Sequence, residues 1–403
     1  MPKILIINTT FAKGGAARVA KDLFANSKSG FDIFFAYGRG RRVTDARTYK
    51  FGNIWETFIH IFLVRFLGLE GYGSYFSTRK LIRFIKKEKF DLIHLHNLHG
   101  YYLNFFWLIK FIQSQKIPVI WTLHDEWPIT WLPAHSLGCN HCQTGRGQCT
   151  NAYNYPKNYF PIFSRYMLRR KKTVFSNDWN PLIICPSEWL KNNIASSFLG
   201  KFRIKVVYNG IDTELFHPMN DKNVLRLKYN LPTDKKIIIF LASNLSDRSK
   251  GIGAIISIAK ILQDRPYIFM GIGRGKTESL NNLITPGYIY DKAKLAEMYA
   301  LSDLFCFAST AETFSLTAAE ALACGLPVVG FDIPVVREIF KENVGALVKL
   351  GDDKALAEAI DSLLGNKESR ITMGNNGRKF IVANYSQELF YNNYNSIYNE
   401  LLK

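Results

Sequence analysis

The sequence predicts an α/β protein made of two doubly wound domains that face each other across a cleft, and three observations support this. Short, continuously apolar runs alternate with helical patterns along the 403 residues, as expected for parallel sheets covered by helices on both faces. The series of runs starts again at 205–218, where Asn209-Gly210 and Pro218 indicate a hinge. The length and the 47% hydrophobic content are enough for two cores.

Ten of these apolar runs are expected to be strands, five in each half of the chain. They are 3–8, 32–37, 91–96, 118–124 and 182–187 in the first half, and 205–210, 236–243, 267–273, 304–309 and 327–331 in the second. Ligands of such sheets bind at the carboxyl ends of the strands, so motifs that follow a strand deserve most weight.

The net charge of +19 belongs entirely to the first half. Residues 1–208 contain 30 Lys and Arg against 11 Asp and Glu, whereas residues 209–403 contain 22 of each. This uneven distribution of charge suggests that only the first half has a polyanionic partner, either nucleic acid or an anionic membrane face. The basic cluster RYMLRRKKT (165–173) is a solvated face by default, but it also suits phosphate or a membrane surface.

We expect a cytoplasmic protein without a membrane span. No secretory signal follows Met1, and six cysteines are too few for a disulfide scaffold. No apolar run reaches the roughly 20 residues that a spanning helix needs. The nearest, 54–69, is interrupted by Glu56, His60 and Arg65, and it fits an interfacial helix and a buried amphipathic helix equally well.

Two glycine-rich stretches follow predicted strands. Gly14-Gly15 opens a helix, so that backbone amides can approach a phosphate, although an ordinary tight turn explains it as well. It lacks the G-x-G-x-x-G pattern, which disfavours a nicotinamide enzyme. MGIGRGKT (270–277) has Met270 where a P-loop needs its first glycine, so we interpret Gly273 and its neighbours as a strand end that lines a phosphate or nucleobase pocket.

Histidines gather after two strands of the first half. His124 ends the run 118–124, which places it in the cleft as a structural or a functional residue. His94 and His96 lie in the run before it, 91–96, and share one strand face, and His99 follows that run. No carboxylate or cysteine follows them at a spacing typical of metal sites, so we favour a polar strand end near a sugar.

A cysteine-rich segment holds Cys139, Cys142 and Cys149, with His135 and His141 nearby. C-x2-C is half of a typical zinc site, and a third cysteine with His135 completes four ligands. The alternatives are a structural zinc and ordinary thiols, because the second C-x2-C of a zinc ribbon is missing.

The stretch ETFSLTAAEALACGLPVVGFD (312–332) allows two interpretations. Thr317 and Glu320 match a capping box at a helix start. Alternatively, Glu312 and Glu320 belong to a ligand site at the end of the strand 304–309. In both cases Gly325 and Pro327 are expected to end the helix.

Together the motifs resemble the GT-B glycosyltransferases of family 4, most closely the bacterial enzymes that build capsule, exopolysaccharide or O-antigen repeat units, including the colanic-acid type. The resemblance rests on FAKGGAARVA, DLIHLHNLHGYYLN, WTLHDEWPITW, PSEWL, VVYNGIDTELFHP and the stretch from Glu312, and it covers essentially the whole chain. It implies two Rossmann-like domains, 1–205 for the acceptor and 206–384 for the nucleotide sugar, and a helix at 385–403 that crosses back to the first domain.

The resemblance also assigns roles to residues. Glu312 corresponds to the acid that contacts the donor sugar, Glu320 to the acid that binds the ribose, Lys250 to the diphosphate cation and His124 to the histidine beside the transferred sugar. The donor-phosphate loops contain Gly14, Gly15, Gly273, Thr313, Phe314, Ser315 and Leu316. His96, Asn97 and Asp125 are expected to contact the acceptor. Asn244 stands where the family usually has an arginine, and Arg248 is the candidate to replace its charge.

The activity that this implies is a retaining transfer from a nucleotide-diphosphate sugar to a glycan acceptor, expected to be linked to polyprenyl diphosphate, with no metal needed for catalysis. The basic, aromatic first half would dock on the inner face of the bacterial membrane. Two rivals remain at this point: a GT-B sugar-nucleotide epimerase, and a basic nucleic-acid-binding protein, which is disfavoured because no recognised binding module carries the charge.

Overall fold

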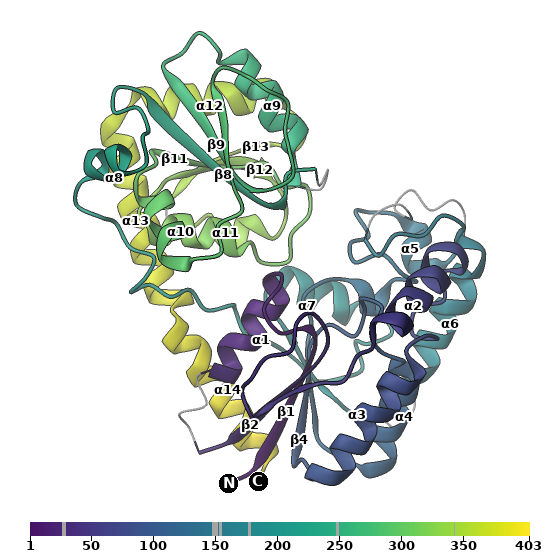
Figure 1. Ribbon diagram of the computed structural model, residues 1–403. Coiled ribbons are helices and arrows are strands. Elements are labelled where there is room, and N and C mark those ends of the chain that lie inside the picture. The colour runs from purple at the N-terminus through teal and green to yellow at the C-terminus, as the bar shows by residue number, and fades with distance from the viewer. Residues whose placement is uncertain (26–29, 147–151, 153–154, 176–178, 247–249, 342) are drawn as a thin grey trace. The chain divides into compact units, whose positions relative to one another are not determined.

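The computed structural model describes residues 1–25, 30–146, 152, 155–175, 179–246, 250–341 and 343–403. The chain divides into two compact units (Figure 1). Unit 1 comprises Met1–Tyr208 and Tyr391–Lys403, and unit 2 comprises Asn209–Phe390. The boundary predicted between residues 205 and 206 lies just before this division. Because 391–403 contributes one Glu and one Lys, unit 1 keeps the whole positive excess of the chain.

Unit 1 is built on a seven-stranded sheet in the order β3-β2-β1-β4-β5-β6-β7. Each pair of neighbouring strands in this sheet is parallel. Its strands are β1 (Lys3–Thr10), β2 (Asp32–Arg39), β3 (Thr48–Lys50), β4 (Leu92–Leu95), β5 (Val119–Thr122), β6 (Leu182–Cys185) and β7 (Ile204–Val206). Its helices are α1 (Gly15–Ala25), α2 (Ile54–Leu67), α3 (Tyr75–Glu88), α4 (Phe105–Gln115), η1 (Trp127–Ile129), α5 (Asn140–Thr144), η2 (Pro161–Phe163), α6 (Ser164–Val174) and α7 (Glu188–Ala195).

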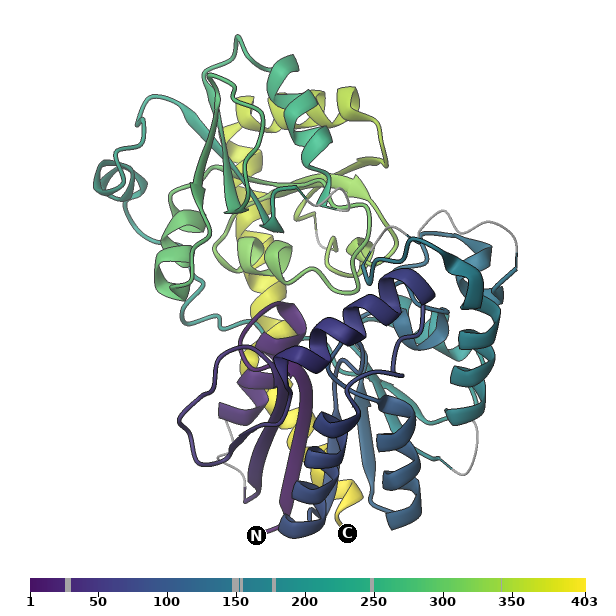
Figure 2. The same ribbon diagram turned by 45° about the vertical axis from the view of Figure 1, so that its right-hand side comes forward.

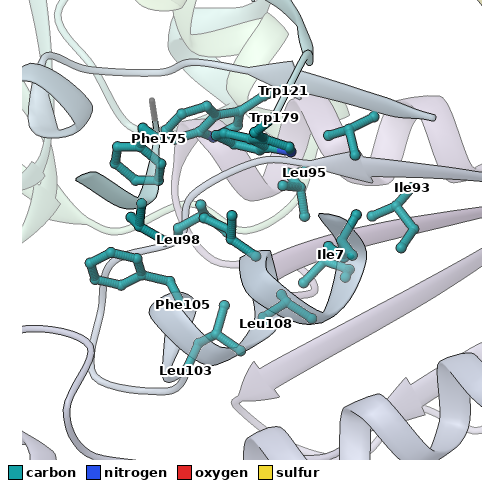
Figure 3. Packing of buried hydrophobic residues seen from close by; sticks show 14 of the residues in the cluster. Ile7, Ile93, Leu95, Leu98, Leu103, Phe105, Leu108, Trp121, Phe175 and Trp179 are labelled. Atoms are coloured by element: carbon teal, nitrogen blue, oxygen red, sulfur yellow. The ribbon is translucent and has the colours of Figure 1, made fainter. Parts of the chain in front are cut away.

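The main core of unit 1 lies on one face of this sheet. Figure 3 shows residues of this core, among them Phe105 and Leu108 of α4, Ile93 and Leu95 of β4, and Trp121 of β5. Alternate residues of each strand point to this face. The residues between them point to the other face and are buried as well, as the continuous apolar runs predicted.

The other face of the sheet is covered in part by α14 (Gln387–Leu401), the last helix of the chain. Tyr394 and Tyr398 are one turn apart and both are buried. The Tyr398 hydroxyl shares a 2.8 Å hydrogen bond with His94 Nδ1, and the Tyr394 hydroxyl shares one of 2.8 Å with Thr122 Oγ1. The end of the chain is therefore an integral part of unit 1.

Unit 2 is built on a six-stranded parallel sheet in the order β10-β9-β8-β11-β12-β13. Its strands are β8 (Lys236–Asn244), β9 (Tyr267–Arg274), β10 (Leu283–Gly287), β11 (Leu304–Phe307), β12 (Val328–Asp332) and β13 (Gly345–Lys349). Its helices are α8 (Lys222–Lys228), α9 (Ile252–Ile261), α10 (Lys292–Ala300), α11 (Leu316–Ala323), η4 (Val336–Glu338), α12 (Asp353–Gly365) and α13 (Lys367–Tyr385).

All ten predicted strands are present, and the α/β fold class with two parallel sheets is confirmed. One assignment was wrong: the strand expected to open the second half is β7, which pairs with β6 at the edge of the unit 1 sheet. The sequence missed β3, β10 and β13, which lie at sheet edges and are not fully buried. Edge strands lack the continuous apolar run that marks a strand buried on both faces.

The structure also decides between the two interpretations of the segment 54–69. The helix α2 buries only His60 and Val64 among its 14 residues, so the buried-core interpretation is wrong. Figure 2 shows α2 at the surface of unit 1. Its apolar residues point in several directions, and most of them remain exposed to solvent.

Candidate active site

Each sheet has one point where the strand order reverses direction, and the candidate residues lie there. In unit 2 the reversal is between β8 and β11, and in unit 1 it is between β1 and β4. Loops after these strands turn to opposite faces of the sheet and leave a crevice, which is where parallel sheets bind ligands. We describe the two crevices separately.

In unit 2, Lys250 and Glu312 come together although 62 positions separate them. Lys250 lies between β8 and α9, Glu312 lies between β11 and α11, and Lys250 Nζ donates to Glu312 Oε1 at 2.5 Å. Both side chains are partly exposed. Lys250 also lines a small pocket with Ser309 and Thr317. The structure therefore places a cation and a carboxylate next to each other at the crevice of unit 2.

The loop that leads into α11 has a strained backbone. Ser315 precedes the helix in the left-handed region at φ 68°, and its buried Oγ has no hydrogen-bond partner among the residues that the structure describes. Phe314 anchors the loop by packing edge-on against Tyr385, with 5.5 Å between the ring centroids. A non-glycine residue in this conformation is uncommon and is often found at functional sites. Thr313 and Leu316 flank these two residues and are half-buried.

The capping-box interpretation of Thr317 and Glu320 is wrong. The helix starts at Leu316, so Thr317 is already inside its first turn, and the residue at the cap is Ser315. Glu320 is 1% exposed, and its Oε2 accepts a hydrogen bond from the Tyr299 hydroxyl at 3.0 Å. The same hydroxyl lies 3.2 Å from the Thr317 carbonyl oxygen. Tyr299 therefore positions Glu320 along the helix.

The end of α11 is as predicted. The helix stops at Ala323, Gly325 follows in the left-handed region at φ 72°, and Pro327 directly precedes β12. The left-handed glycine ends the helix and the proline prevents its continuation.

The remaining donor-site candidates of unit 2 lie at the end of β8 and β9. Gly273 is tightly packed, because a Cβ added to it would lie 2.3 Å from the Ala242 carbonyl oxygen. Asn244 is exposed, and its Oδ1 accepts a hydrogen bond from the Ser246 amide at 3.0 Å. Arg248, the candidate to replace the missing charge, lies outside the residues that the structure describes.

In unit 1, Gly14 lies between β1 and α1, Gly15 is the first residue of α1, and both are exposed. Gly14 adopts φ 94°, and a Cβ added to it would meet nothing within 4 Å. A side chain here is therefore excluded by backbone conformation and not by crowding. The first amides of a helix have no partner inside it, so this turn has the geometry of a phosphate-binding loop.

Three histidines of unit 1 form a connected series. His94 and His96 have ring centroids 4.4 Å apart, and His96 Nδ1 shares a 2.8 Å hydrogen bond with His124 Nε2, whose ring is stacked on it. Burial lowers the pKa of His124 to about 4 and that of His94 to about 3, and it lowers the pKa of His96 well below its usual value. All three are therefore neutral near pH 7, and His96 orients His124.

Most of the residues expected to contact the acceptor make hydrogen bonds to other residues of unit 1. His96 is 1% exposed, and its Nδ1 is hydrogen-bonded to His124. Asp125 accepts from His99 Nε2 at 2.8 Å and from the Trp127 amide at 3.0 Å. Burial raises the pKa of Asp125, but His99, His135 and the Trp127 amide together outweigh burial, so the net shift of the pKa is downward. Asn97 is half-buried, and its carbonyl oxygen accepts from the Tyr102 hydroxyl.

The proposed zinc ligands are not brought together in the described part of the chain. Cys139 precedes α5 and Cys142 lies within it, whereas Cys149 is outside the described residues. Across the described ranges, no group of three or more His, Cys, Asp or Glu side chains is arranged to hold a metal ion. The structural zinc, with His135 as a ligand, stays a prediction.

Sequence reasoning missed the residues that position these groups. The Tyr299 hydroxyl donates to Glu320. The Tyr398 and Tyr394 hydroxyls are hydrogen-bonded to His94 and Thr122, respectively. The only available signal was the i, i+4 spacing of the two tyrosines in the last helix, which places them on one face. The role of Tyr299 could not be predicted, because the residues around it in the sequence do not distinguish it from an ordinary core aromatic residue.

Comparison with solved structures defines the class of protein. The chain superposes on sucrose-phosphate synthase from Thermosynechococcus elongatus with a TM-score of 0.73 at 18% identity, covering 100% of this chain and 99% of that one. It superposes on the Anabaena protein HepE, solved in complex with UDP-glucose, with a TM-score of 0.68 at 17% identity, covering 99% of each. The fold is GT-B.

The family follows from the sequence comparisons. The model described as Glycosyltransferase Family 4 matches residues 13–215, and the model described as Glycosyl transferases group 1 matches residues 221–380. The chain belongs to glycosyltransferase family 4. A relative from Escherichia coli (strain K12), assigned to colanic acid biosynthesis as a glycosyl transferase, is 26% identical over 364 residues, which cover 86% of this chain and 87% of that protein.

Proposed function

We propose that this glycosyltransferase moves a sugar, with retention of configuration, from a nucleotide-diphosphate sugar to a glycan acceptor during the synthesis of a bacterial surface polysaccharide. The observation that carries the donor assignment is the Lys250–Glu312 pair at the switch point of unit 2, next to the strained start of α11. A cation and helix amides stabilise a leaving diphosphate, and a carboxylate accepts hydrogen bonds from sugar hydroxyls. The colanic acid assignment of the Escherichia coli relative and the UDP-glucose bound to HepE support this choice.

The proposed reaction needs no additional nucleophile. The bond between the anomeric carbon and the diphosphate oxygen breaks while the acceptor oxygen bonds to the same face of that carbon. The acceptor proton passes to the leaving phosphate, and Lys250 stabilises the charge on the diphosphate. Neutral His124 would orient the sugar by hydrogen bonding, because a histidine with a pKa of about 4 carries no charge at pH 7.

A thermal-shift screen of UDP, GDP, dTDP and CMP sugars tests the donor assignment. We expect one diphosphate sugar to raise the melting temperature, since a ligand at about 100 times its Kd adds roughly 2.7 kcal/mol of stability. Nucleoside diphosphate should then be released only when an acceptor is present. Conversion of the nucleotide sugar to its epimer without an acceptor would favour an epimerase, and salt-dependent stabilisation by nucleic acid alone would contradict the proposal.

We further propose that unit 1 docks on the anionic inner face of the cell membrane, where an acceptor linked to polyprenyl diphosphate would reside. The large apolar side chains that α2 exposes include Trp55 (74% exposed), Phe58 (58%) and Phe62 (56%). Phe66, at its end, packs near Phe160, and the two aromatic rings extend the apolar surface toward η2. Exposed apolar patches of this kind mark membrane or protein contacts.

The charge next to this apolar surface favours a membrane over a protein partner. Arg165 of α6 is exposed directly after η2, Arg169 and Lys172 are exposed further along the same helix, and Arg79 and Lys80 are exposed on α3. Basic side chains near an anionic membrane contribute about 1 kcal/mol each. Among the described residues, no helix is both long and apolar enough to cross a bilayer. The proposed contact is therefore a helix lying in the membrane surface.

Sedimentation with phosphatidylglycerol vesicles tests the docking surface. The double variant Phe58→Ser/Phe62→Ser should bind at least about tenfold more weakly than the natural protein, because each buried aromatic side chain contributes roughly 1.5–3 kcal/mol. The matched control is Val224→Ser/Leu227→Ser on α8, which removes two equally exposed apolar side chains from unit 2 and should bind normally. A natural protein that stays in the supernatant at low salt would contradict membrane docking.

A further inference from the structure

A group of polar side chains around the peptide of Gly100 has no role in the functions described so far. Glu70, between α2 and α3, is completely buried, and its Oε1 accepts from the amides of Gly100 at 3.2 Å and Tyr101 at 3.4 Å. Its Oε2 has no hydrogen-bond partner among the described residues. A buried carboxylate oxygen without a partner is costly, so its presence requires an explanation.

His99, the neighbour of Gly100, offers a second open acceptor. Its Nε2 lies 2.8 Å from Asp125 Oδ2, whereas its buried Nδ1 has no partner within the described part of unit 1. In the tautomer whose proton lies on the nitrogen that faces the carboxylate, Nδ1 is a hydrogen-bond acceptor. Asp125 thus determines which nitrogen of His99 is available.

Tyr155 forms the outer wall of this group. Its ring packs against His99 at 5.6 Å and Tyr101 at 6.3 Å between centroids, and 51% of the residue is exposed. Its hydroxyl would lie 3.2 Å from a Cβ placed on Gly100. Burial of the hydroxyl end of the side chain, together with Tyr101 and Glu70, raises the pKa of Tyr155, so this hydroxyl stays protonated and can donate.

The backbone here is held in an unusual conformation. Gly100 and Tyr101 are consecutive left-handed residues, with φ of 107° and 64°. This turn directs both amides to Glu70, and Arg39 Nη1 fixes it by donating to the Gly100 carbonyl oxygen at 3.1 Å. Strain of this kind persists where the surrounding structure enforces it, often at ligand sites.

We propose that Glu70, His99 and Tyr155, which we call the Gly100 cluster, bind hydroxyl groups of the acceptor sugar. The inference rests on the proposed function and names residues of its acceptor site. Two open acceptors, Glu70 Oε2 and His99 Nδ1, call for a ligand that donates hydrogen bonds, as sugar hydroxyls do. Aromatic rings at the wall suit the apolar face of a sugar ring. His99 follows β4, at the ligand-binding edge of the unit 1 sheet, and its partner Asp125 follows β5.

Saturation-transfer NMR with millimolar glucose, galactose and N-acetylglucosamine tests the Gly100 cluster on the full chain. We expect transfer to at least one of these sugars, and a binding constant at least about tenfold weaker in Glu70→Gln and in Tyr155→Phe, because each variant removes one hydrogen-bonding group. Tyr155→Phe keeps the ring packing, so it tests the site even if Glu70→Gln destabilises the fold. Binding of UDP-glucose should be unchanged in both variants.

Glu126→Gln is the matched control, because Glu126 is a buried carboxylate of the same unit whose oxygens already accept from Ser136 and Asn193. Its sugar binding should equal that of the natural protein. If no sugar receives saturation while a nucleotide sugar still binds, the cluster holds only buried water and the inference fails, although the proposed function stands. If no nucleotide sugar binds either, the proposed function itself fails.

Discussion

Glu312→Gln should lower kcat about 100-fold or more while changing the Kd for the nucleoside diphosphate by less than about threefold, because a transition-state contact is lost and ground-state binding is not. Glutamine keeps the size of the side chain but removes the charge that pairs with Lys250 Nζ at 2.5 Å. In the proposed reaction, the sugar would then keep only a neutral amide oxygen as hydrogen-bond acceptor in place of a charged carboxylate. Steady-state turnover and calorimetric titration with the nucleoside diphosphate measure the two effects separately.

The two acids of this stretch should respond differently. Glu320 is buried and bonded to Tyr299, and we expect Glu320→Gln to weaken nucleotide binding more than turnover. Glu278→Gln is the control, since it breaks an exposed pair of the same type, at 2.7 Å from Lys260, in the same unit. Exposed pairs contribute about 0–1 kcal/mol, so this variant should behave like the natural protein. If Glu312→Gln and Glu320→Gln lower only the melting temperature, both acids are structural.

Gly251→Ala should lower the melting temperature of unit 2 by roughly 5–10 °C, which corresponds to about 2–4 kcal/mol. Gly251 precedes α9 in the left-handed region at φ 68°, and an added Cβ would lie 1.8 Å from the Ala308 carbonyl oxygen. Ala308 follows β11, so the oxygen cannot move without disturbing the sheet. Because Gly251 is next to Lys250, the variant should also lose nucleotide-sugar binding. Differential scanning calorimetry with and without the donor measures both.

Gly253→Ala is the matched control for this prediction. Gly253 lies two residues further along, inside α9, and an added Cβ would meet nothing within 4 Å. Alanine there should stabilise the helix by about 0.5–1 kcal/mol, because it has less backbone freedom to lose on folding. Equal melting temperatures of Gly251→Ala and the natural protein would mean that the close approach to Ala308 does not exist in solution.

The sequence by itself was sufficient for the fold class and for the positions of the central strands. A strand that is buried on both faces is a continuous apolar run, as in β1, β6 and β8, and no distant residue is needed to recognise it. The end of α11 could also be predicted from the nearby sequence, because a glycine such as Gly325 ends a helix through its own backbone conformation. The edge strands β3 and β13 escaped prediction because their residues are only half-buried.

Only the tertiary structure decided which side chains meet. The pairing of Lys250 with Glu312 requires β8 and β11 to be neighbours, which strand order and not sequence distance determines. The same holds for Glu70 and Gly100, and for His94 and Tyr398, 304 positions apart. Apolar periodicity reports how deeply a residue is buried, whereas a hydrogen bond depends on which loop reaches which edge of the sheet. The sequence therefore determined the layers of this protein, and the packing of those layers determined its candidate site.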